Sequence, residues 1–161
     1  MLLDFTVNKK HVTLEIKADE MLVDILRDRL ELTGSKISCQ EGECGACTVW
    51  LDEQPINSCI VPAAKVQGRS ITTIEGLGDS EIPHIVQERI AKFGASQCGY
   101  CTPGFVMVAT ALLRDNPDAS HSEIIEGLSG NLCRCTGYTR IIAAVQSLAD
   151  PTVDIPLPEE I

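Results

Sequence analysis

The chain has 161 residues, of which 44% are apolar and 22% charged, and its formal net charge is −10 at pH 7. This length suits one ordinary domain or two small ones, and the composition supports a buried core and excludes a disordered chain. The acidic balance argues against nucleic acid as a partner, because phosphate groups require a basic surface.

Strand signals dominate the first half of the chain. Five segments are expected as short strands: residues 3–7, 12–16, 48–51, 56–61 and 70–74. Apolar residues at helical spacing predict a helix over about 21–30 with Asp19 as its cap, and residues 52–55 predict a turn. A small mixed sheet crossed by one helix is typical of plant-type ferredoxin-like (β-grasp) domains. Residues 1–75 are therefore expected to form such a domain.

Helical signals dominate the second half, after a glycine-rich linker expected at residues 76–80. Four short helices are expected, over about residues 80–93, 102–115, 120–128 and 138–149. Ser80 can cap the first of them, and Ser120 begins a capping box at the third. We predict an α+β chain in which residues 81–150 form a four-helix bundle, followed by an extended tail over 151–161.

Eight cysteines fall into two sets of four, and the first set has the spacing C-x4-C-x2-C-x11-C. Its members are Cys39, Cys44, Cys47 and Cys59. The first three keep the ligand spacing of plant-type 2Fe–2S ferredoxins. Gly42, Gly45 and Ala46 lie between them and leave room for backbone amides to bond the sulfurs of a cluster. A four-cysteine zinc site is the alternative, although zinc sites usually pair two C-x2-C knuckles.

The second set combines a C-x2-C pair with a C-x-C pair, separated by 31 residues. Its members are Cys98, Cys101, Cys133 and Cys135. Each pair precedes an expected helix, where the partial positive charge of the helix N-terminus favours thiolates. Zinc and a redox-active Cys-x-x-Cys are the alternatives, and this spacing alone does not exclude them. Together the two sets suggest two one-electron centres, each a 2Fe–2S cluster.

No other functional motif accompanies the cysteines. No dinucleotide or Walker motif is present, so no substrate-converting site is expected on this chain. We interpret His11, His84 and His121 as structural or solvated, and Trp50 and Met107 as core residues. No signal-peptide pattern and no transmembrane segment is recognised, so a reducing, cytoplasmic compartment is expected. In such a compartment thiols serve as metal ligands more readily than as disulfides.

The cysteine motifs resemble those of a known family. They read CQEGECGAC at 39–47, QCGYCTPG at 97–104 and GNLCRCTGY at 130–138. This combination resembles the small iron–sulfur subunit of the xanthine dehydrogenase / molybdenum hydroxylase family, which includes the small subunits of carbon monoxide dehydrogenases. The resemblance covers about residues 1 to 150 and includes all eight cysteines.

The resemblance implies cofactors on partner subunits. A large subunit would bind a molybdopterin-type cofactor and a medium subunit FAD, in a dimer of heterotrimers. The second cysteine set would hold the cluster near the pterin, and the first set the cluster nearer the flavin. Gln97 and Cys135 would approach the pterin by hydrogen bonding, although from its sequence context alone Gln97 is better interpreted as a loop amide bonded to its own backbone.

The implied function is electron transfer between the molybdopterin site and FAD, or another carrier, within a molybdenum-containing oxidoreductase. The alternative is a free-standing two-cluster ferredoxin or redox sensor that works without partners. A structural zinc protein is a third and more distant hypothesis.

Overall fold

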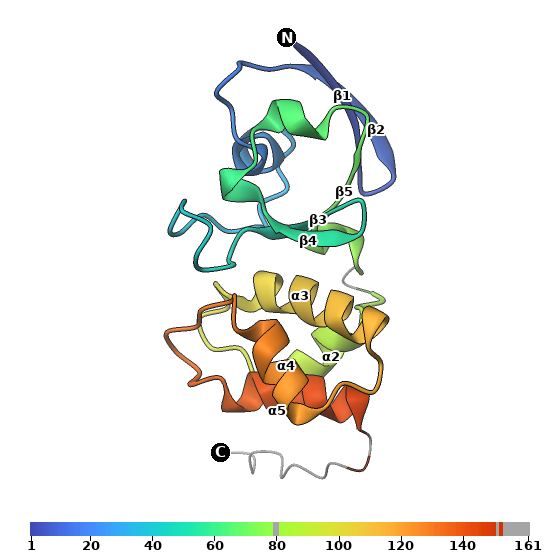
Figure 1. Cartoon of the computed structure of the whole chain (residues 1–161), viewed down its shortest axis with the longest axis vertical. Helices are drawn as coiled ribbons and strands as arrows, with labels where there is room; N and C mark the ends of the chain where they lie inside the picture. Colours follow the sequence, from blue (N-terminus) through green and yellow to red (C-terminus); the bar gives the residue numbers. More distant parts are fainter. Residues whose placement is uncertain (79–80, 151, 153–161) are drawn as a thin grey trace.

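The structure is a computed structural model, and it describes residues 1–78, 81–150 and 152. Two halves are stacked along the long axis of the molecule (Figure 1). The sheet half comprises residues 1–76 and the helical half residues 81–150. This arrangement confirms the predicted α+β fold class.

The elements follow each other in the order that the sequence predicts. Five strands form the sheet: β1 (Leu2–Val7), β2 (Lys10–Glu15), β3 (Thr48–Leu51), β4 (Gln54–Asn57) and β5 (Ser70–Thr72). The sheet half also contains short helical segments: α1 (Leu22–Asp24), the π-helical η1 (Ile25–Arg29) and the 3-10 turns η2 (Ser58–Ile60), η3 (Ala63–Val66) and η4 (Ile74–Gly76). The helical half contains α2 (Ile85–Lys92), α3 (Thr102–Asp115), α4 (His121–Leu128) and α5 (Thr139–Ala149).

The sheet has the strand order β2-β1-β5-β3-β4. β1 runs parallel to β5, whereas the other neighbouring pairs are antiparallel. Along β1 every second side chain is buried, and Leu3 and Phe5 share a core with Leu22 and Leu26 of the α1–η1 segment. The buried side chains of β1 therefore lie on one face of the sheet, and the α1–η1 segment packs against that face.

The helix expected over residues 21–30 is shorter and less regular than predicted. Asp19 does not cap it, because Met21 is the N-cap residue and makes no side-chain cap bond. The first backbone amide, that of Leu22, donates instead to the carbonyl of Val61 at 2.8 Å. A tertiary partner thus satisfies a group that a cap would otherwise serve. The segment then widens into a π-turn, in which Leu30 N–H bonds the carbonyl of Ile25 at 3.1 Å.

The turn expected over residues 52–55 is a two-residue hairpin turn. Asp52 and Glu53 adopt φ values of 47° and 69°, which suit the right-handed twist of the flanking strands. Pro55 already belongs to β4. It is tolerated there because β4 is an edge strand, where a missing N–H leaves no ladder partner unsatisfied.

The helical half contains all four predicted helices around a core of its own. The members of that core include Val86, Ile90, Phe105, Ile124, Ile141 and Val145. α2 begins about five residues later than predicted, because His84 is its cap and forms a capping box with Gln87. The predicted cap, Ser80, lies outside the described residues. The predicted capping box at Ser120 is present at the start of α4.

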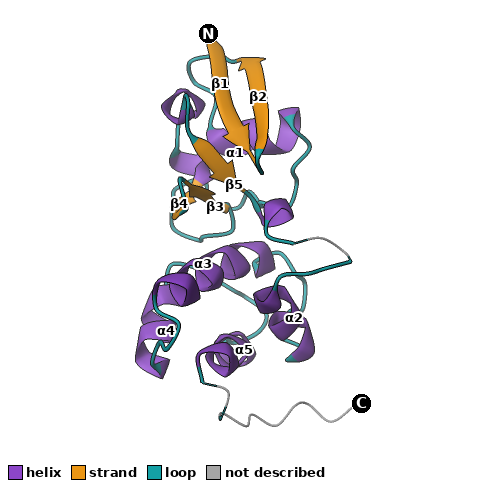
Figure 2. Cartoon of the chain, turned by 90° about the vertical axis from the view of Figure 1, so that its right-hand side faces the viewer, coloured by secondary structure: helices purple, strands orange, loops and turns teal. Residues whose placement is uncertain are grey.

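The two halves meet where β3 lies against α3 (Figure 2). Trp50 is buried there with Met107 and Ala111, and its indole N–H donates to the carbonyl of Met107 at 3.0 Å. The guanidinium of Arg114 lies 5.2 Å from the centre of the Trp50 ring and donates to the carbonyl of Glu53. Trp50 and Met107 are therefore core residues as predicted, and the core they form joins the two halves.

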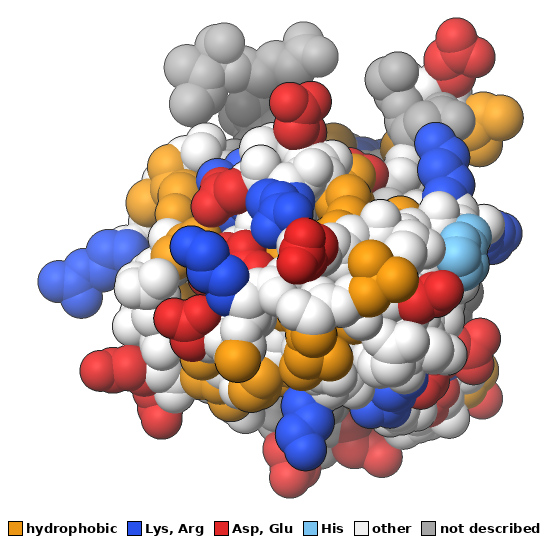
Figure 3. Space-filling model, turned by 90° about the horizontal axis from the view of Figure 1, so that it is seen from above, with side chains coloured by type: hydrophobic (Ala, Val, Ile, Leu, Met, Phe, Trp, Pro, Cys, Tyr) orange, Lys and Arg blue, Asp and Glu red, His pale blue; other side chains and the backbone are white. Residues whose placement is uncertain are grey.

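The surface at the sheet end of the molecule mixes acidic, basic and apolar side chains (Figure 3). On this face the excess negative charge is spread out and not gathered into one patch. Among the described residues, no helix is both long and apolar enough to cross a membrane.

Candidate iron–sulfur sites

The first cysteine set lies in the sheet half, and Cys44 is the member that contacts the helical half. Cys39, Cys44 and Cys47 come from the loop between η1 and β3. Cys59 was expected on a strand over residues 56–61, but β4 ends at Asn57 and Cys59 lies in η2. In this turn Cys59 is buried beside Cys47.

Glycines shape the first cysteine loop. Gly42 and Gly45 adopt φ values of 79° and 69°, a region that side-chain-bearing residues rarely occupy. Position 45 must be glycine for a second reason. A β-carbon there would lie 2.4 Å from Nδ2 of Asn131 and 2.6 Å from the carbonyl oxygen of Gly130. Gly45 is therefore required for contact with the helical half as well as for the curvature of the loop.

The thiols of the first set lie in two close pairs, Cys39 with Cys44 and Cys47 with Cys59. The backbone amides of Glu41 and Cys44 lower the pKa of Cys39 to about 6, so that its thiolate is favoured. Burial raises the pKa of Cys59 to about 11, and the Cys47 thiol adds to this effect. A buried thiol of this kind ionises readily only against a bound cation.

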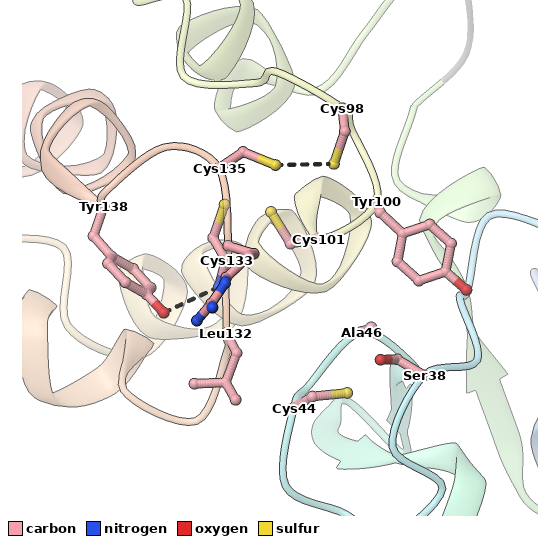
Figure 4. Close-up of a pocket in the computed structure, with 11 residues that line it drawn as sticks. Ser38, Cys44, Ala46, Cys98, Tyr100, Cys101, Leu132, Cys133, Cys135 and Tyr138 are labelled. Carbon is pink, nitrogen blue, oxygen red and sulfur yellow. Dashed lines mark hydrogen bonds between the residues drawn. The ribbon is translucent and has the colours of Figure 1, made fainter.

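The second cysteine set brings together two loops of the helical half (Figure 4). Cys98 and Cys101 immediately precede α3, and Cys133 and Cys135 lie between α4 and α5, as predicted. The Sγ atoms of Cys98 and Cys135 are 3.5 Å apart. The thiol of Cys133 lies near enough to Cys101 to raise the pKa of Cys101.

Two residues that the sequence analysis did not single out support Cys133. The hydroxyl and the backbone amide of Thr136 both donate to its sulfur, at 3.0 and 3.4 Å. The hydroxyl of Tyr138 accepts the N–H of Cys133 at 3.0 Å (Figure 4). Their place at the end of the GNLCRCTGY motif was the signal that could have indicated them.

Electrostatics differ between the thiols of the second set. Burial raises the pKa of Cys101 to about 12, and the neighbouring Cys133 thiol contributes. Burial also raises the pKa of Cys133, but hydrogen bonds from the hydroxyl and amide of Thr136 outweigh it and lower the pKa to about 7. The nearby Cys98 thiol raises the pKa of Cys135. Like the first set, the second combines a thiol that ionises easily with thiols that need a cation.

One cavity connects the two cysteine sets. It has a volume of about 450 Å³ and is lined by all four cysteines of the second set and by Cys44 of the first (Figure 4). At its edge the backbone N–H of Leu132 donates to the carbonyl of Cys44 at 3.0 Å. The residue before Cys133 is thus bonded directly to a member of the first set.

The paired thiols fit 2Fe–2S clusters better than zinc. A cluster of this type takes four cysteine ligands, two on each of its two irons, whereas structural zinc needs four ligands around one point. The approach of Cys98 to Cys135 at 3.5 Å is the kind of pairing that a two-iron cluster requires.

The other residues considered from the sequence lie outside the cysteine loops or at their edge. Gln97 is exposed and adjoins Cys98, which is exposed together with Cys135. This side of the second set therefore faces outward. His84 is structural as predicted, since its ring accepts the N–H of Val86 at the start of α2. His121 is exposed.

Comparison with known proteins identifies two cluster-binding regions. A family described as "2Fe-2S iron-sulfur cluster binding domain" matches residues 5–70, and one described as "[2Fe-2S] binding domain" matches residues 73–146. Each region contains one cysteine set. The chain therefore carries two 2Fe–2S clusters.

Relatives of similar length are subunits of larger enzymes. The chain is 48% identical to the nicotine 6-hydroxylase small subunit of Paenarthrobacter nicotinovorans, over 89% of this chain and 86% of that protein. It is 42% identical to the nicotinate dehydrogenase small FeS subunit of Eubacterium barkeri, over 89% and 92%. Aldehyde oxidase 1 of Oryctolagus cuniculus is 43% identical over 91% of this chain, which spans only 12% of that longer protein. These relatives do not favour a free-standing ferredoxin or sensor.

A solved structure is similar to this chain in both sequence and fold. Quinoline 2-oxidoreductase from Pseudomonas putida 86 has a chain that is 41% identical, with a TM-score of 0.89 and 92% of each chain covered. With two cluster-binding regions and small-subunit relatives of matching length, the chain belongs to the small iron–sulfur subunits of the molybdenum hydroxylase family, and it is an electron-transfer subunit.

Proposed function

We propose that this chain carries electrons between a molybdopterin site on a large partner subunit and FAD on a medium partner subunit. A 2Fe–2S cluster supplies a centre that accepts and releases one electron at a time. The chain's own contribution is to hold two such centres close together, to set their potentials by hydrogen bonds and to present them to the partners.

The ligand assignment is part of this proposal. The thiols of Cys39, Cys44, Cys47 and Cys59 hold one cluster, and those of Cys98, Cys101, Cys133 and Cys135 hold the other. The pairwise approach of the thiols in both sets supports this assignment. The presence of one cysteine set in each of the two regions also supports it. We propose that these regions are separate domains over residues 1–75 and 81–150, joined by the linker at 76–80. The extended tail proposed for residues 151–161 lies outside the described residues except for Thr152.

Exposure supports one orientation of the electron path between the partners. Cys98 and Cys135 are the exposed members of the second set, and Gln97 is exposed beside them. We assign this edge to the pterin, with Gln97 and Cys135 as the hydrogen-bonding positions. The first set is then the one nearer the flavin.

The observation that carries the proposal is the direct connection between the two sets. The hydrogen bond from Leu132 to the carbonyl of Cys44 joins the backbone of one cysteine loop to that of the other. A chain with two unrelated centres has no need to bring its cysteine loops into hydrogen-bonding contact across two halves of the molecule. A chain that passes electrons from one to the other does.

Co-purification tests this function and the assembly it requires. We expect the chain, isolated from its native host without overexpression, to be accompanied by two larger polypeptides, with molybdenum and FAD in the same fractions. We also propose a cytoplasmic location and a dimer of heterotrimers, which cell fractionation and the mass of the complex would check. Isolation of an iron-containing chain without partners, molybdenum or flavin would favour the free-standing ferredoxin or sensor.

A further inference from the structure

Asn131 is a buried polar residue between the two cysteine sets. It is only 3% exposed and lies two positions before Cys133. Its side-chain Nδ2 donates to the carbonyl of Gly45 at 3.0 Å, across 86 residues of sequence. Gly45 in turn lies between Cys44 and Cys47. One buried amide therefore bonds the second cysteine loop to the first.

The carbonyl of Gly45 is a shared acceptor. It receives the hydroxyl and the N–H of Thr48, at 2.7 and 3.2 Å, in addition to the amide of Asn131. The next carbonyl along the loop, that of Cys44, receives the N–H of Leu132. Two consecutive carbonyls of the first loop are thus bonded by two consecutive residues of the second, and their relative position is fixed at two points.

A third segment closes on the same carbonyl. Gly104, in the first turn of α3, has no side chain, and a β-carbon there would lie 2.3 Å from the Gly45 oxygen and 2.8 Å from Nδ2 of Asn131. Gly104 follows Cys101 by three residues. Both loops of the second set, through Asn131 and through Gly104, therefore meet the first set at Gly45.

We propose that Asn131 is a positioning residue for electron transfer between the two clusters. Its amide, packed against Gly45 and Gly104, holds the two cysteine sets at one separation and keeps the Leu132–Cys44 hydrogen bond in place. The inference rests on the proposed function. It adds to that function a residue whose hydrogen bond goes to Gly45 and not to a cysteine. Transfer between two centres falls steeply with their separation, so a small relaxation of this contact has a large effect on rate.

The test compares Asn131→Ala with Asn57→Ala in the intact complex. Asn57 is a matched control, because its Nδ2 also donates to a carbonyl of the first loop, that of Gly42 at 2.6 Å, but from within the sheet half. The magnetic splitting between the two reduced clusters, measured by paramagnetic resonance, reports their separation and orientation independently of turnover. Rapid-mixing measurements give the rate of flavin reduction in the same samples.

We expect Asn131→Ala to keep the signals of both clusters, to weaken their mutual splitting and to slow flavin reduction by about tenfold or more, as loss of a supporting hydrogen bond around a metal site often does. We expect Asn57→Ala to alter the potential of the first cluster and to keep the splitting. Unchanged splitting and unchanged flavin reduction in Asn131→Ala would overturn the inference. Loss of either cluster from that variant would show a role in assembly and would also overturn it.

A second variant approaches the contact from the opposite side. Gly104→Ala keeps the Asn131 amide but inserts a methyl group against the Gly45 carbonyl. We expect it to weaken the splitting as well, and an unchanged splitting would count against positioning by this contact. A wild-type complex that passes no electrons from molybdenum to flavin would refute the proposed function, while the splitting would still decide the role of Asn131.

Discussion

At the scale of single residues, we expect Thr136 to tune the second cluster without binding it. Its hydroxyl and its amide both point to the sulfur of Cys133. A cluster and its thiolates gain negative charge on reduction, so donors to a ligand sulfur stabilise the reduced state more than the oxidised state and raise the reduction potential. Thr136 should therefore make the second cluster a better electron acceptor.

Replacing Thr136 with Val tests this effect with little change in shape. Loss of one hydroxyl donor, worth about 1 kcal/mol, should lower the potential of the second cluster by on the order of 40 mV for a one-electron couple. Redox titration followed by paramagnetic resonance would measure it.

Thr139→Val is the matched control for that substitution. The hydroxyl of Thr139 bonds the carbonyl of Gly137 and not a sulfur, so the potential should stay unchanged. Equal shifts in the two variants would mean that the Thr136 hydroxyl has no specific effect on the cluster.

At the scale of elements, the N-terminus of α2 depends on a titratable cap. The ring Nδ1 of His84 accepts the N–H of Val86 at 3.3 Å, and burial lowers the pKa of His84. A lowered pKa means that the folded state favours the neutral ring, which alone can accept this bond. The contribution of the cap is therefore present above the usual imidazole pKa of about 6.5, and it is lost as the pH falls below that value.

We expect the first turn of α2 to lose hydrogen-exchange protection as the pH falls below about 6.5, because the ring must then be protonated at the expense of the cap bond. His84→Asn should abolish this dependence, because Asn is a good cap that does not titrate. His121→Asn, on the exposed start of α4, should leave the response of α2 as it is in the wild type. A pH response that persists in His84→Asn would assign it to another group.

Elements whose ends are marked by local chemistry could be predicted from the sequence. The capping box at Ser120 placed α4, and Pro103 with Asn116 bounded α3. Prediction was wrong where a distant segment decides the local structure. Asp19 does not cap α1, because the carbonyl of Val61 satisfies the first amide of the helix.

The candidate site divides in the same way. The spacing of the cysteines predicted two sets of four, because ligands of one loop are close in sequence. The sequence did not indicate which thiols lie in pairs, such as Cys98 with Cys135, since this depends on how two loops meet. Asn131 stands in the GNLCRCTGY motif as a turn residue, but the sequence did not indicate its contact, because the partner is 86 residues away.

At the scale of the whole molecule, the two halves meet at a buried contact and are joined there by hydrogen bonds. Two halves connected only by a flexible linker would not need such a contact. Trp50 of β3 inserts against α3 and donates its indole N–H to the carbonyl of Met107. Arg114 covers the ring from the side of α3, and Tyr100 donates its hydroxyl to the carbonyl of Ile37. These contacts keep the two cysteine sets in one fixed arrangement.

Trp50→Phe should weaken this contact while keeping an aromatic ring in place. We expect the free energy of unfolding to fall by about 1 kcal/mol from the lost hydrogen bond, with an added penalty for incomplete packing. Urea unfolding of the iron-loaded chain, followed by circular dichroism, would measure the change. Ile125→Ala, at an exposed position of α4, should change stability by less than about 0.5 kcal/mol. Equal effects of the two substitutions would contradict a specific role for Trp50.

In the proposed function, electrons cross this chain from one partner to the other. Cys135 is the residue to change, because the proposal makes it both a ligand of the second cluster and a group beside the pterin. In stopped-flow measurements on the reassembled complex, Cys135→Ser should let substrate reduce molybdenum at close to the wild-type rate, while reduction of the flavin stalls. For a complex that works in the reductive direction, the same two steps are followed in reverse order. Flavin reduction at the wild-type rate in this variant would mean that electrons bypass the second cluster, and it would contradict the account.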